Sequence, residues 1–417
     1  MRLLADTVEA RARVLAQHGF NLDLIPSRLV LDDYQTDSLM HGDCTGFPLV
    51  QQDGDGELDE RLAAAFQALF GISQVLSVAQ GRLAEALLVN ALITSGECVL
   101  GSAPFPTLQA HLQLRGATYV TVSTTDANGD FRADLDCVAL EQAIKRVGRH
   151  RIPFLLVEAC TNANGGAPVS VDNLRAVKAV AGRYGIPLML DATRVFSNAC
   201  LIREHASEWR GHDELGIVQA LCALVDGVLL SATKEMPTTI GGFLALRDRS
   251  LFERCRDQAL IFGTGLDLLG KRRLLTAMHE PNGLVKQVRS RIDQVRRFHA
   301  RLQLGGESRV GAHGVFLVGG APMTPMHARA FLNHLYVGYG VRGALNPGGS
   351  AGHGDALVRF ALGVPGKDER VLETAAICIR EALREADQHI ALEEVHRPAG
   401  LAGGMLATYR KARSVQP

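Results

Sequence analysis

Short apolar segments that alternate with helical segments constrain the fold of this chain more than any other feature. Each segment is too short and too rich in β-branched residues or leucine to be a helix. Two of them enclose Ser170–Tyr184, which begins with capping side chains and is followed by Gly185, as a helix between two strands would be. The alternation predicts an α/β fold with a mostly parallel sheet. The predicted strands are Gln74–Val78, Glu97–Leu100, Phe154–Glu158, Leu188–Asp191, Gly227–Ser231 and Phe243–Leu246.

The length of the chain predicts more than one domain. With 417 residues, of which 47% are hydrophobic, the chain exceeds the usual size of a single core, about 100–200 residues. A long charged helix at 285–304 is expected to lead into the second domain, and the glycine-rich stretch 343–354 is expected to be a long loop. In chain order we expect an N-terminal helix and arm that packs with the small domain (1–45), a large domain (46–280), a small C-terminal α+β domain (281–395) and a tail (396–417).

Composition narrows the class of partner. Lys plus Arg (44) balances Asp plus Glu (44), so no general attraction to nucleic acid or to an anionic membrane is expected. The eight cysteines are scattered without metal-binding spacing, which predicts no metal site and a reduced compartment. We expect no signal peptide, because charged residues soon interrupt the apolar start of the sequence, and no run approaches about 18 apolar residues. We therefore expect a soluble, cytoplasmic protein that acts on a small molecule.

The first motif with chemical meaning is Gln80-Gly81-Arg82. It follows a predicted strand and opens the helical segment Leu83–Ile93, so backbone N–H groups and the helix dipole would face an anion placed there. A phosphate suits such a site. The alternative is an ordinary turn between a strand and a helix that carries a surface arginine.

The second motif is Asp191-Ala192-Thr193-Arg194, at the end of a predicted buried strand. The carboxyl edge of an α/β sheet is where ligand-binding groups gather. A partly desolvated carboxylate there needs a cation, and a protonated pyridine nitrogen would serve. The alternative is a salt bridge between Asp191 and Arg194 that only fixes the loop.

The third motif is Ser231-Ala232-Thr233-Lys234, again directly after a strand. Partial burial lowers the pKa of a lysine and leaves an amine that can form a Schiff base, although most lysines are simply solvated. The three motifs together are stronger evidence than each motif alone, because one ligand requires all three. A phosphate anchor, an aspartate for a ring nitrogen and a lysine for an aldehyde are what pyridoxal 5′-phosphate (PLP) requires.

Several motifs of this chain match one known family. They are Gln80-Gly81-Arg82 with Ala84-Glu85, Asn162 to Ser170, Asn173 to Val177, Asp191 to Arg194, and Lys234 with Ile240 to Leu244. In these motifs the chain resembles the β-eliminating lyases typified by tryptophanase and tyrosine phenol-lyase. The resemblance is strongest over residues 74–248 and extends more thinly from about Thr36 to Arg359. It implies the aspartate-aminotransferase fold (fold type I), with a mostly parallel seven-stranded sheet in the large domain and a homodimer or homotetramer.

Carried over position by position, the resemblance implies a role for each matched residue. Lys234 is the Schiff-base lysine and Asp191 the partner of the pyridinium nitrogen, while Arg194 and Asn162 contact the ring oxygen. Arg359 binds the α-carboxylate of the substrate, since a bidentate guanidinium suits a carboxylate. The phosphate ligands, the stacking aromatic ring and the helpers of the carboxylate site are Gln80, Gly81, Arg82 and Ser231; Phe105; and Thr36 and Ser38.

The sequence differs from the family at the positions that protonate or contact the leaving group and at the position that binds a cation. An ungapped match places Asp53 where the family has its general-acid tyrosine, and Gln51 where a glutamate binds a monovalent cation. The arginine that contacts the phenol ring in the tyrosine enzyme of the family matches a position near Asn346. Thr233 stands where the family has a lysine next to the catalytic lysine. The cofactor residues are thus kept while the leaving-group and cation residues are replaced.

These observations predict a PLP-dependent lyase that deprotonates Cα of an L-amino acid through Lys234 and eliminates a β-substituent, giving a 2-keto acid and ammonia. A leaving group that needs little protonation, such as a thiolate in C–S cleavage, is easiest to accommodate. Transamination, aldol cleavage, β-replacement and an oxidative reaction remain alternatives with the same cofactor. A cofactor-free or regulatory protein that kept the fold is a further alternative, against which the intact Lys234, Asp191 and Arg194 argue.

Overall fold

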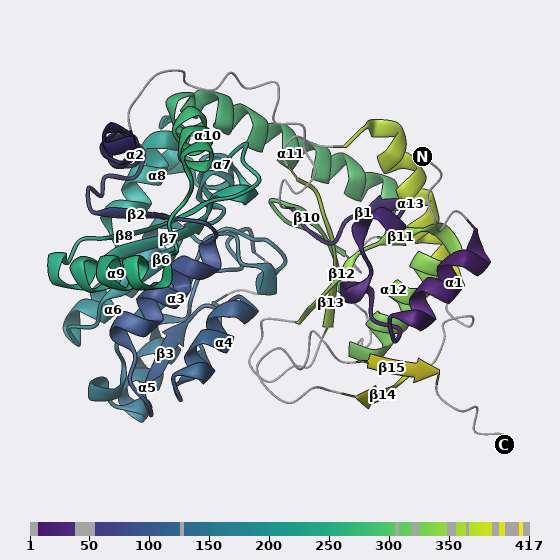
Figure 1. Cartoon of the computed structure of the whole chain (residues 1–417), viewed down its shortest axis with the longest axis horizontal. Helices are drawn as coiled ribbons and strands as arrows, with labels where there is room; N and C mark the ends of the chain where they lie inside the picture. Colours follow the sequence, from purple (N-terminus) through teal and green to yellow (C-terminus); the bar gives the residue numbers. More distant parts are fainter. Residues whose placement is uncertain are drawn as a thin grey trace.

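The computed structural model consists of two halves, each with helices packed on a sheet, joined by one long helix (Figure 1). Side chains of residues 55–56, 346–347, 356–357, 392–396 and 410–411 are not described. The structure describes residues 7–37, 55–125, 129–304, 308–318, 325–347, 356–363, 367–385, 392–396 and 408–411.

The larger half is built on a seven-stranded sheet with the strand order β2-β8-β7-β6-β5-β3-β4. Strands β3 to β7 pair in parallel, whereas β8 pairs antiparallel with both β7 and β2. The predicted α/β fold with a mostly parallel seven-stranded sheet is therefore confirmed, and the sequence pattern missed only β4 of its strands. The strands are β2 (Val75–Val78), β3 (Cys98–Gly101), β4 (Thr118–Thr121), β5 (Leu155–Glu158), β6 (Leu188–Asp191), β7 (Gly227–Ser231) and β8 (Gly242–Leu246).

Helices cover both faces of this sheet because successive side chains of its buried strands point to opposite faces. In β5, Leu155 and Val157 belong to one hydrophobic core and Leu156 to the other. The first core takes residues from helices α2 (Asp55–Phe70), α5 (Cys137–Val147), α6 (Val171–Arg183), α7 (Val195–His205), α8 (Glu214–Ala223) and α10 (Leu268–His279). The second takes residues from α3 (Gly81–Leu92), α4 (Pro106–Leu114) and α9 (Arg249–Phe262).

Helix α6 shows how local sequence sets these elements. The side chain of Ser170 accepts a hydrogen bond of 3.0 Å from the backbone N–H of Asn173, which caps the first turn. Leu174 and Val177 lie on the buried face, and the helix is followed by Gly185 at φ 59°. The helix predicted at 170–184 is confirmed.

The smaller half contains a four-stranded antiparallel sheet with the order β12-β13-β10-β9. Its β12 occupies the start of the stretch 343–354, so the expectation of a long loop there was wrong for these residues: Ala344 and Leu345 pair with β13. The elements of this half are β9 (Ser308–Val310), β10 (Gly314–Leu317), α12 (Pro325–Tyr339), β11 (Val341–Arg342), β12 (Ala344–Pro347), β13 (Ala356–Ala361), α13 (Glu369–Arg384), β14 (Leu392–His396) and β15 (Thr408–Lys411).

The N-terminal arm packs with the smaller half. Helix α1 (Val8–Gln17) contributes Leu15 to the same core as Phe331 of α12. Strand β1 (Asp32–Asp33) pairs in parallel with β11. Before β1 the arm is not simply extended, because Ser27–Leu29 forms a short 3-10 helix.

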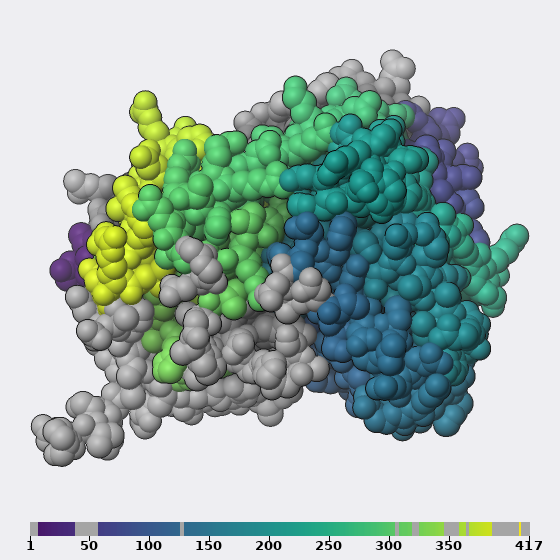
Figure 2. Space-filling model, turned by 180° about the vertical axis from the view of Figure 1, so that it is seen from behind, coloured from purple at the N-terminus to yellow at the C-terminus, as the bar shows by residue number. Residues whose placement is uncertain are grey.

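Helix α11 (Pro281–Leu302) connects the two halves, as Figure 1 shows and Figure 2 shows from behind, where its green band lies between the teal helices and the yellow α13. Leu284 and Val288 pack in the core of the larger half, whereas Val295 and Phe298 pack in the core of the smaller half. The domain boundary drawn near residue 280 from the sequence stays a prediction. Within the described part of the chain, no helix is both long enough and apolar enough to cross a membrane.

Candidate active site

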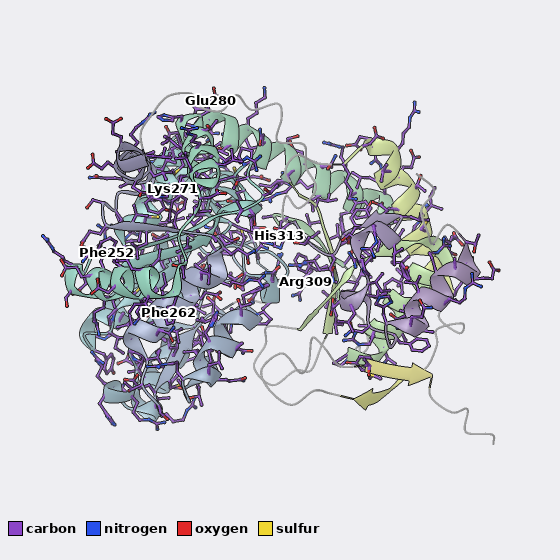
Figure 3. All side chains as sticks on the ribbon, in the orientation of Figure 1. Phe252, Phe262, Lys271, Glu280, Arg309 and His313 are labelled. Carbon is purple, nitrogen blue, oxygen red and sulfur yellow. The ribbon has the colours of Figure 1, made fainter. Side chains whose placement is uncertain are left out.

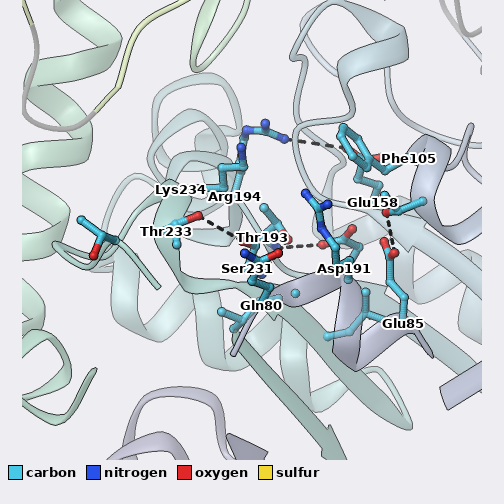
Figure 4. Close-up of a pocket in the computed structure, with 16 residues that line it drawn as sticks. Gln80, Glu85, Phe105, Glu158, Asp191, Thr193, Arg194, Ser231, Thr233 and Lys234 are labelled. Atoms are coloured by element: carbon cyan, nitrogen blue, oxygen red, sulfur yellow. Dashed lines mark hydrogen bonds and ion pairs between the residues drawn. The ribbon is translucent and has the colours of Figure 1, made fainter. Parts of the chain in front are cut away.

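A cavity of about 160 Å³ lies where β5, β6 and β7 end and α3 begins. Figure 4 shows Lys234 and Ser231 on one side of this cavity and Glu85 and Phe105 on the other. Most of the residues predicted from the sequence to hold the cofactor thus meet at one place. Those that line the cavity are Gln80, Gly81, Arg82, Phe105, Asp191, Arg194, Ser231 and Lys234.

The anchor for an anion is the start of α3. Gln80 precedes the helix and its side chain makes no capping hydrogen bond, so the first-turn N–H groups have no side-chain cap. A Cβ on Gly81 would lie 2.8 Å from Cβ of Ser231, so only glycine allows the helix to begin this close to the end of β7. Arg82 is exposed and lines the same cavity. This geometry suits a phosphate.

Asp191 ends β6 and is buried. Its Oδ1 accepts a hydrogen bond of 3.0 Å from the backbone N–H of Thr193, and burial raises the pKa of the carboxyl. The alternative of an ion pair with Arg194 is not what the described residues form, because Arg194 pairs with Asp37 instead. Asp191 therefore presents a desolvated carboxyl to the cavity.

Lys234 follows β7 in a short 3-10 helix, Ala232–Lys234. Its Nζ donates a hydrogen bond of 3.3 Å to Oγ1 of Thr36 and lies 3.3 Å from Oδ1 of Asp37. Burial lowers the pKa of Lys234 to about 8, partly offset by Asp37. A substantial fraction of the amine is therefore neutral near physiological pH, which a solvated lysine would not be.

Arg194 stands directly before α7 and is 3% exposed. Its Nε and Nη2 donate hydrogen bonds of 2.8 and 3.1 Å to the two carboxylate oxygens of Asp37. Burial alone would raise the pKa of Asp37, but Arg194 and Lys234 hold it well below its usual range. Asp37 thus carries the negative charge that balances both cations.

Asn162 and Arg359 meet beside this cluster although the chain separates them widely. Nη1 of Arg359 donates a hydrogen bond to Oδ1 of Asn162, and Nη2 donates one of 3.0 Å to the backbone oxygen of Gln35. His313, labelled in Figure 3 at the junction of the two halves, places Nε2 2.9 Å from the same Oδ1 of Asn162. Burial lowers the pKa of Arg359 to about 10. The smaller half thus brings a guanidinium to the edge of the site.

The other residues predicted to contact the substrate are Asn346, Ser38 and Asp53. The backbone of Asn346 lies in β12 and pairs with Leu357, and its side chain is not among those described. Ser38 and Asp53 lie outside the described residues, as does Gln51.

Three buried carboxyl groups of the site were given no role in the sequence analysis, although Glu85 belongs to one of its motifs. Asp37 lies between Thr36 and Ser38, both of which were chosen, but nothing local showed that the arm returns to the sheet. Glu158 ends a buried strand as Asp191 does, so the same rule would have found it. Glu85 lies one turn into α3 and accepts a hydrogen bond of 2.6 Å from Thr107.

These residues fit PLP. The start of α3 and Gly81 leave room for a phosphate, Asp191 offers a desolvated carboxyl to a ring nitrogen, and Lys234 offers an amine of lowered pKa to an aldehyde. The required groups surround one cavity.

Solved structures share the fold. A PLP-dependent aminotransferase from Streptococcus suis superposes with a TM-score of 0.66, covering 93% of this chain and 100% of that one at 15% sequence identity. Aspartate aminotransferase from Thermus thermophilus (double mutant 1) gives a TM-score of 0.62, with 90% and 95% covered at 17% identity. Fold and site together define a PLP-dependent enzyme of fold type I.

Sequence relatives specify the class further. Tyrosine phenol-lyase of Symbiobacterium sp. (strain SC-1) is 29% identical, with 95% of this chain and 93% of the relative covered. Tyrosine phenol-lyase of Nostoc punctiforme is also 29% identical, with 93% and 90% covered. Residues 51–338 match the family described as Beta-eliminating lyase, and the chain belongs to that family. It is a PLP-dependent lyase that acts on an amino-acid substrate.

Proposed function

We propose that this chain cleaves a β-substituent from an L-amino acid at the cavity between β5, β6, β7 and α3, releasing a 2-keto acid and ammonia. The observation that carries the proposal is the position of Lys234, whose Nζ lies in the same cavity as Asp191 and has a pKa of about 8. An amine with that pKa can accept a proton from Cα near neutral pH.

Bound PLP supplies an aldehyde carbon for an amine and a protonated ring that takes up electrons from Cα. In this proposal Asp191 keeps the ring nitrogen protonated, and Arg194 with Asn162 binds the ring oxygen. The first turn of α3, with Ser231, binds the phosphate, and Phe105 covers one face of the ring. Nζ of Lys234 holds the proton taken from Cα.

Arg359 binds the α-carboxylate of the substrate in this proposal. Its guanidinium is buried, it already contacts Asn162 and the backbone of Gln35, and its Nε has no hydrogen-bond partner within the described part of the chain. A buried guanidinium with donor capacity to spare is suited to a carboxylate. Thr36 and Ser38 assist it, together with Asn346 on the adjacent strand β12.

The leaving group is proposed to be one that departs without strong protonation, such as a thiolate. The position of the family's general-acid tyrosine matches Asp53, and Thr233 replaces the lysine next to Lys234. An aspartate ionised near neutral pH protonates a leaving group poorly, so cleavage of a C–S bond is favoured over release of a phenol or an indole.

A panel of amino acids tests the proposal. Purified protein supplied with PLP is incubated with S-alkyl and S-aryl cysteines, O-acyl serines, tyrosine and tryptophan, without an added keto acid. We expect ammonia, pyruvate and thiol in equal amounts from one of the cysteine conjugates, and none from a Lys234→Ala variant. Turnover that requires a keto-acid acceptor, or that releases an aldehyde, would instead indicate transamination or aldol cleavage.

An oligomer forms part of the proposal. The end of α9 and the start of α10 expose a row of large apolar side chains, of which Leu260 is 76% and Ile261 78% exposed. Apolar patches of this kind mark association surfaces. We expect a homodimer or homotetramer in light scattering, and a shift to monomer when Leu260 and Ile261 are both replaced by aspartate.

A further inference from the structure

Glu158 and Asp191 end neighbouring strands at the same level of the sheet. The two residues are register partners in the parallel pair β5–β6, and both side chains line the cavity. Adjacent strands lie about 4.8 Å apart, and partners in register point to the same face. Glu158 is 4% exposed and Asp191 8%. Two carboxyl groups therefore lie side by side in a desolvated place.

The nearby cations do not balance a negative charge on both Glu158 and Asp191. Nε and Nη2 of Arg194 donate hydrogen bonds to Asp37. Its Nη1 lies 3.9 Å from Oε1 of Glu158, which is beyond hydrogen-bond distance. The backbone N–H of Asn162 donates a long hydrogen bond of 3.5 Å to the same oxygen. A negative charge on Glu158 is therefore only weakly stabilised by these neighbours.

The charged groups around Glu158 shift its pKa in opposite directions. Burial raises the pKa of Glu158 to about 8, and the neighbouring carboxyls of Asp191 and Glu85 act in the same direction, while Arg194 opposes them. Tyr119 of β4 and Arg359 of β13 also lie within electrostatic reach. The balance favours the protonated form of Glu158.

We propose that Glu158 is a positioning residue for the cofactor, a neutral carboxylic acid beside Asp191 that keeps the negative charge of the strand-end pair on Asp191. Two adjacent buried carboxyls share one proton, because ionising both is costly. The ring nitrogen requires the charge on Asp191, so the proton resides on Glu158. This inference rests on the proposed assignment of Asp191 and Lys234 to PLP.

The test compares Glu158→Gln, which copies the neutral acid but cannot ionise, with Glu158→Asp, which can. Glu204→Gln, a change of the same kind on the surface, is the control. The visible absorption of the PLP-loaded proteins is followed from roughly pH 6 to pH 10. The wild type should show a spectral step near pH 8, as should Glu204→Gln; Glu158→Asp should keep a step at a shifted midpoint, and Glu158→Gln should lose it.

Affinity for PLP at pH 7 gives an independent readout. Glu158→Gln should bind PLP within about threefold of the wild type, because it replaces one neutral group by another. A loss of more than about tenfold would show that Glu158 acts as an ionised partner of Arg194, and would overturn the inference. A spectral step near pH 8 that persists in Glu158→Gln would also overturn it. A wild type that binds PLP at a residue other than Lys234 would refute the proposed function itself, and the inference with it.

Discussion

Oδ2 of Asp37 accepts a hydrogen bond of 2.8 Å from Nε of Arg194, although the two residues are 157 positions apart in the chain. The same carboxylate lies 3.3 Å from Nζ of Lys234. The N-terminal arm therefore supplies the counter-ion for two cations that stand at the end of the large sheet. Folding of the arm and the charge state of Lys234 are coupled through this one group.

Replacing Asp37 with asparagine should destabilise the protein strongly. The change leaves Arg194 buried without its ion pair, at a cost of about 3–5 kcal/mol in the free energy of unfolding. Denaturant unfolding measures this cost. The control is Asp172→Asn, which breaks the exposed pair with Arg175 and should cost less than about 1 kcal/mol. Equal effects of the two substitutions would contradict the account.

Gly81→Ala should weaken binding of PLP. The new Cβ would come within 2.9 Å of the backbone of Ser231, so the start of α3 must move away from the end of β7. We expect the dissociation constant of PLP to rise by more than about tenfold. Gly182→Ala in α6 is the matched control, because its Cβ would have no neighbour within 4 Å. If both variants bound PLP equally well, the phosphate anchor would not be at Gly81.

Capture of PLP by the apoprotein should depend on pH through Lys234. Burial lowers the pKa of this amine to about 8, and only the neutral amine attacks an aldehyde. The rate of appearance of visible absorption should therefore rise with pH and level off above about 8. Stopped-flow absorption measures the profile. A rate that keeps rising toward about pH 10.4, the ordinary value for lysine, would contradict the lowered pKa.

Arg291 of α11 should be essential for the backbone position of Lys234. It is buried, its Nη1 donates a hydrogen bond of 3.1 Å to the backbone oxygen of Lys234, and its Nη2 donates one of 2.9 Å to Oε1 of Glu235. Arg291→Met should cost about 3–5 kcal/mol in the free energy of unfolding, because Glu235 is left buried without its cation.

The double variant Arg291→Met with Glu235→Gln isolates the ion pair. Removing both charges should recover part of the loss, since no uncompensated charge stays buried. Additive losses in the two single variants and the double variant would show that the pair is not coupled.

The sequence predicted those parts of the structure that depend on local pattern. The buried strands are continuous apolar runs, and helix α6 carries its own cap at Ser170. Strand β4 (Thr118–Thr121) escaped detection because it is a short edge strand with partly exposed and mainly polar side chains. The antiparallel direction of β8 also has no local signal, since its residues are as buried as those of a parallel strand.

The site was predictable as far as strand ends were concerned. Asp191 ends a buried strand and Lys234 closely follows one. Glu158 also ends a buried strand and met the same criterion. Asp37 did not, because its role depends on the arm folding back across the molecule to reach Arg194. Contacts of that kind are set by tertiary packing, which no short motif encodes.

The central claim is that Lys234 carries the cofactor. Reduction of the PLP-loaded protein with borohydride, digestion and mass spectrometry of the peptides tests it directly. We expect a stable pyridoxyl adduct on Lys234, and no such adduct in Lys234→Ala. An adduct found only on another lysine, such as Lys271, or no adduct at all, would contradict it.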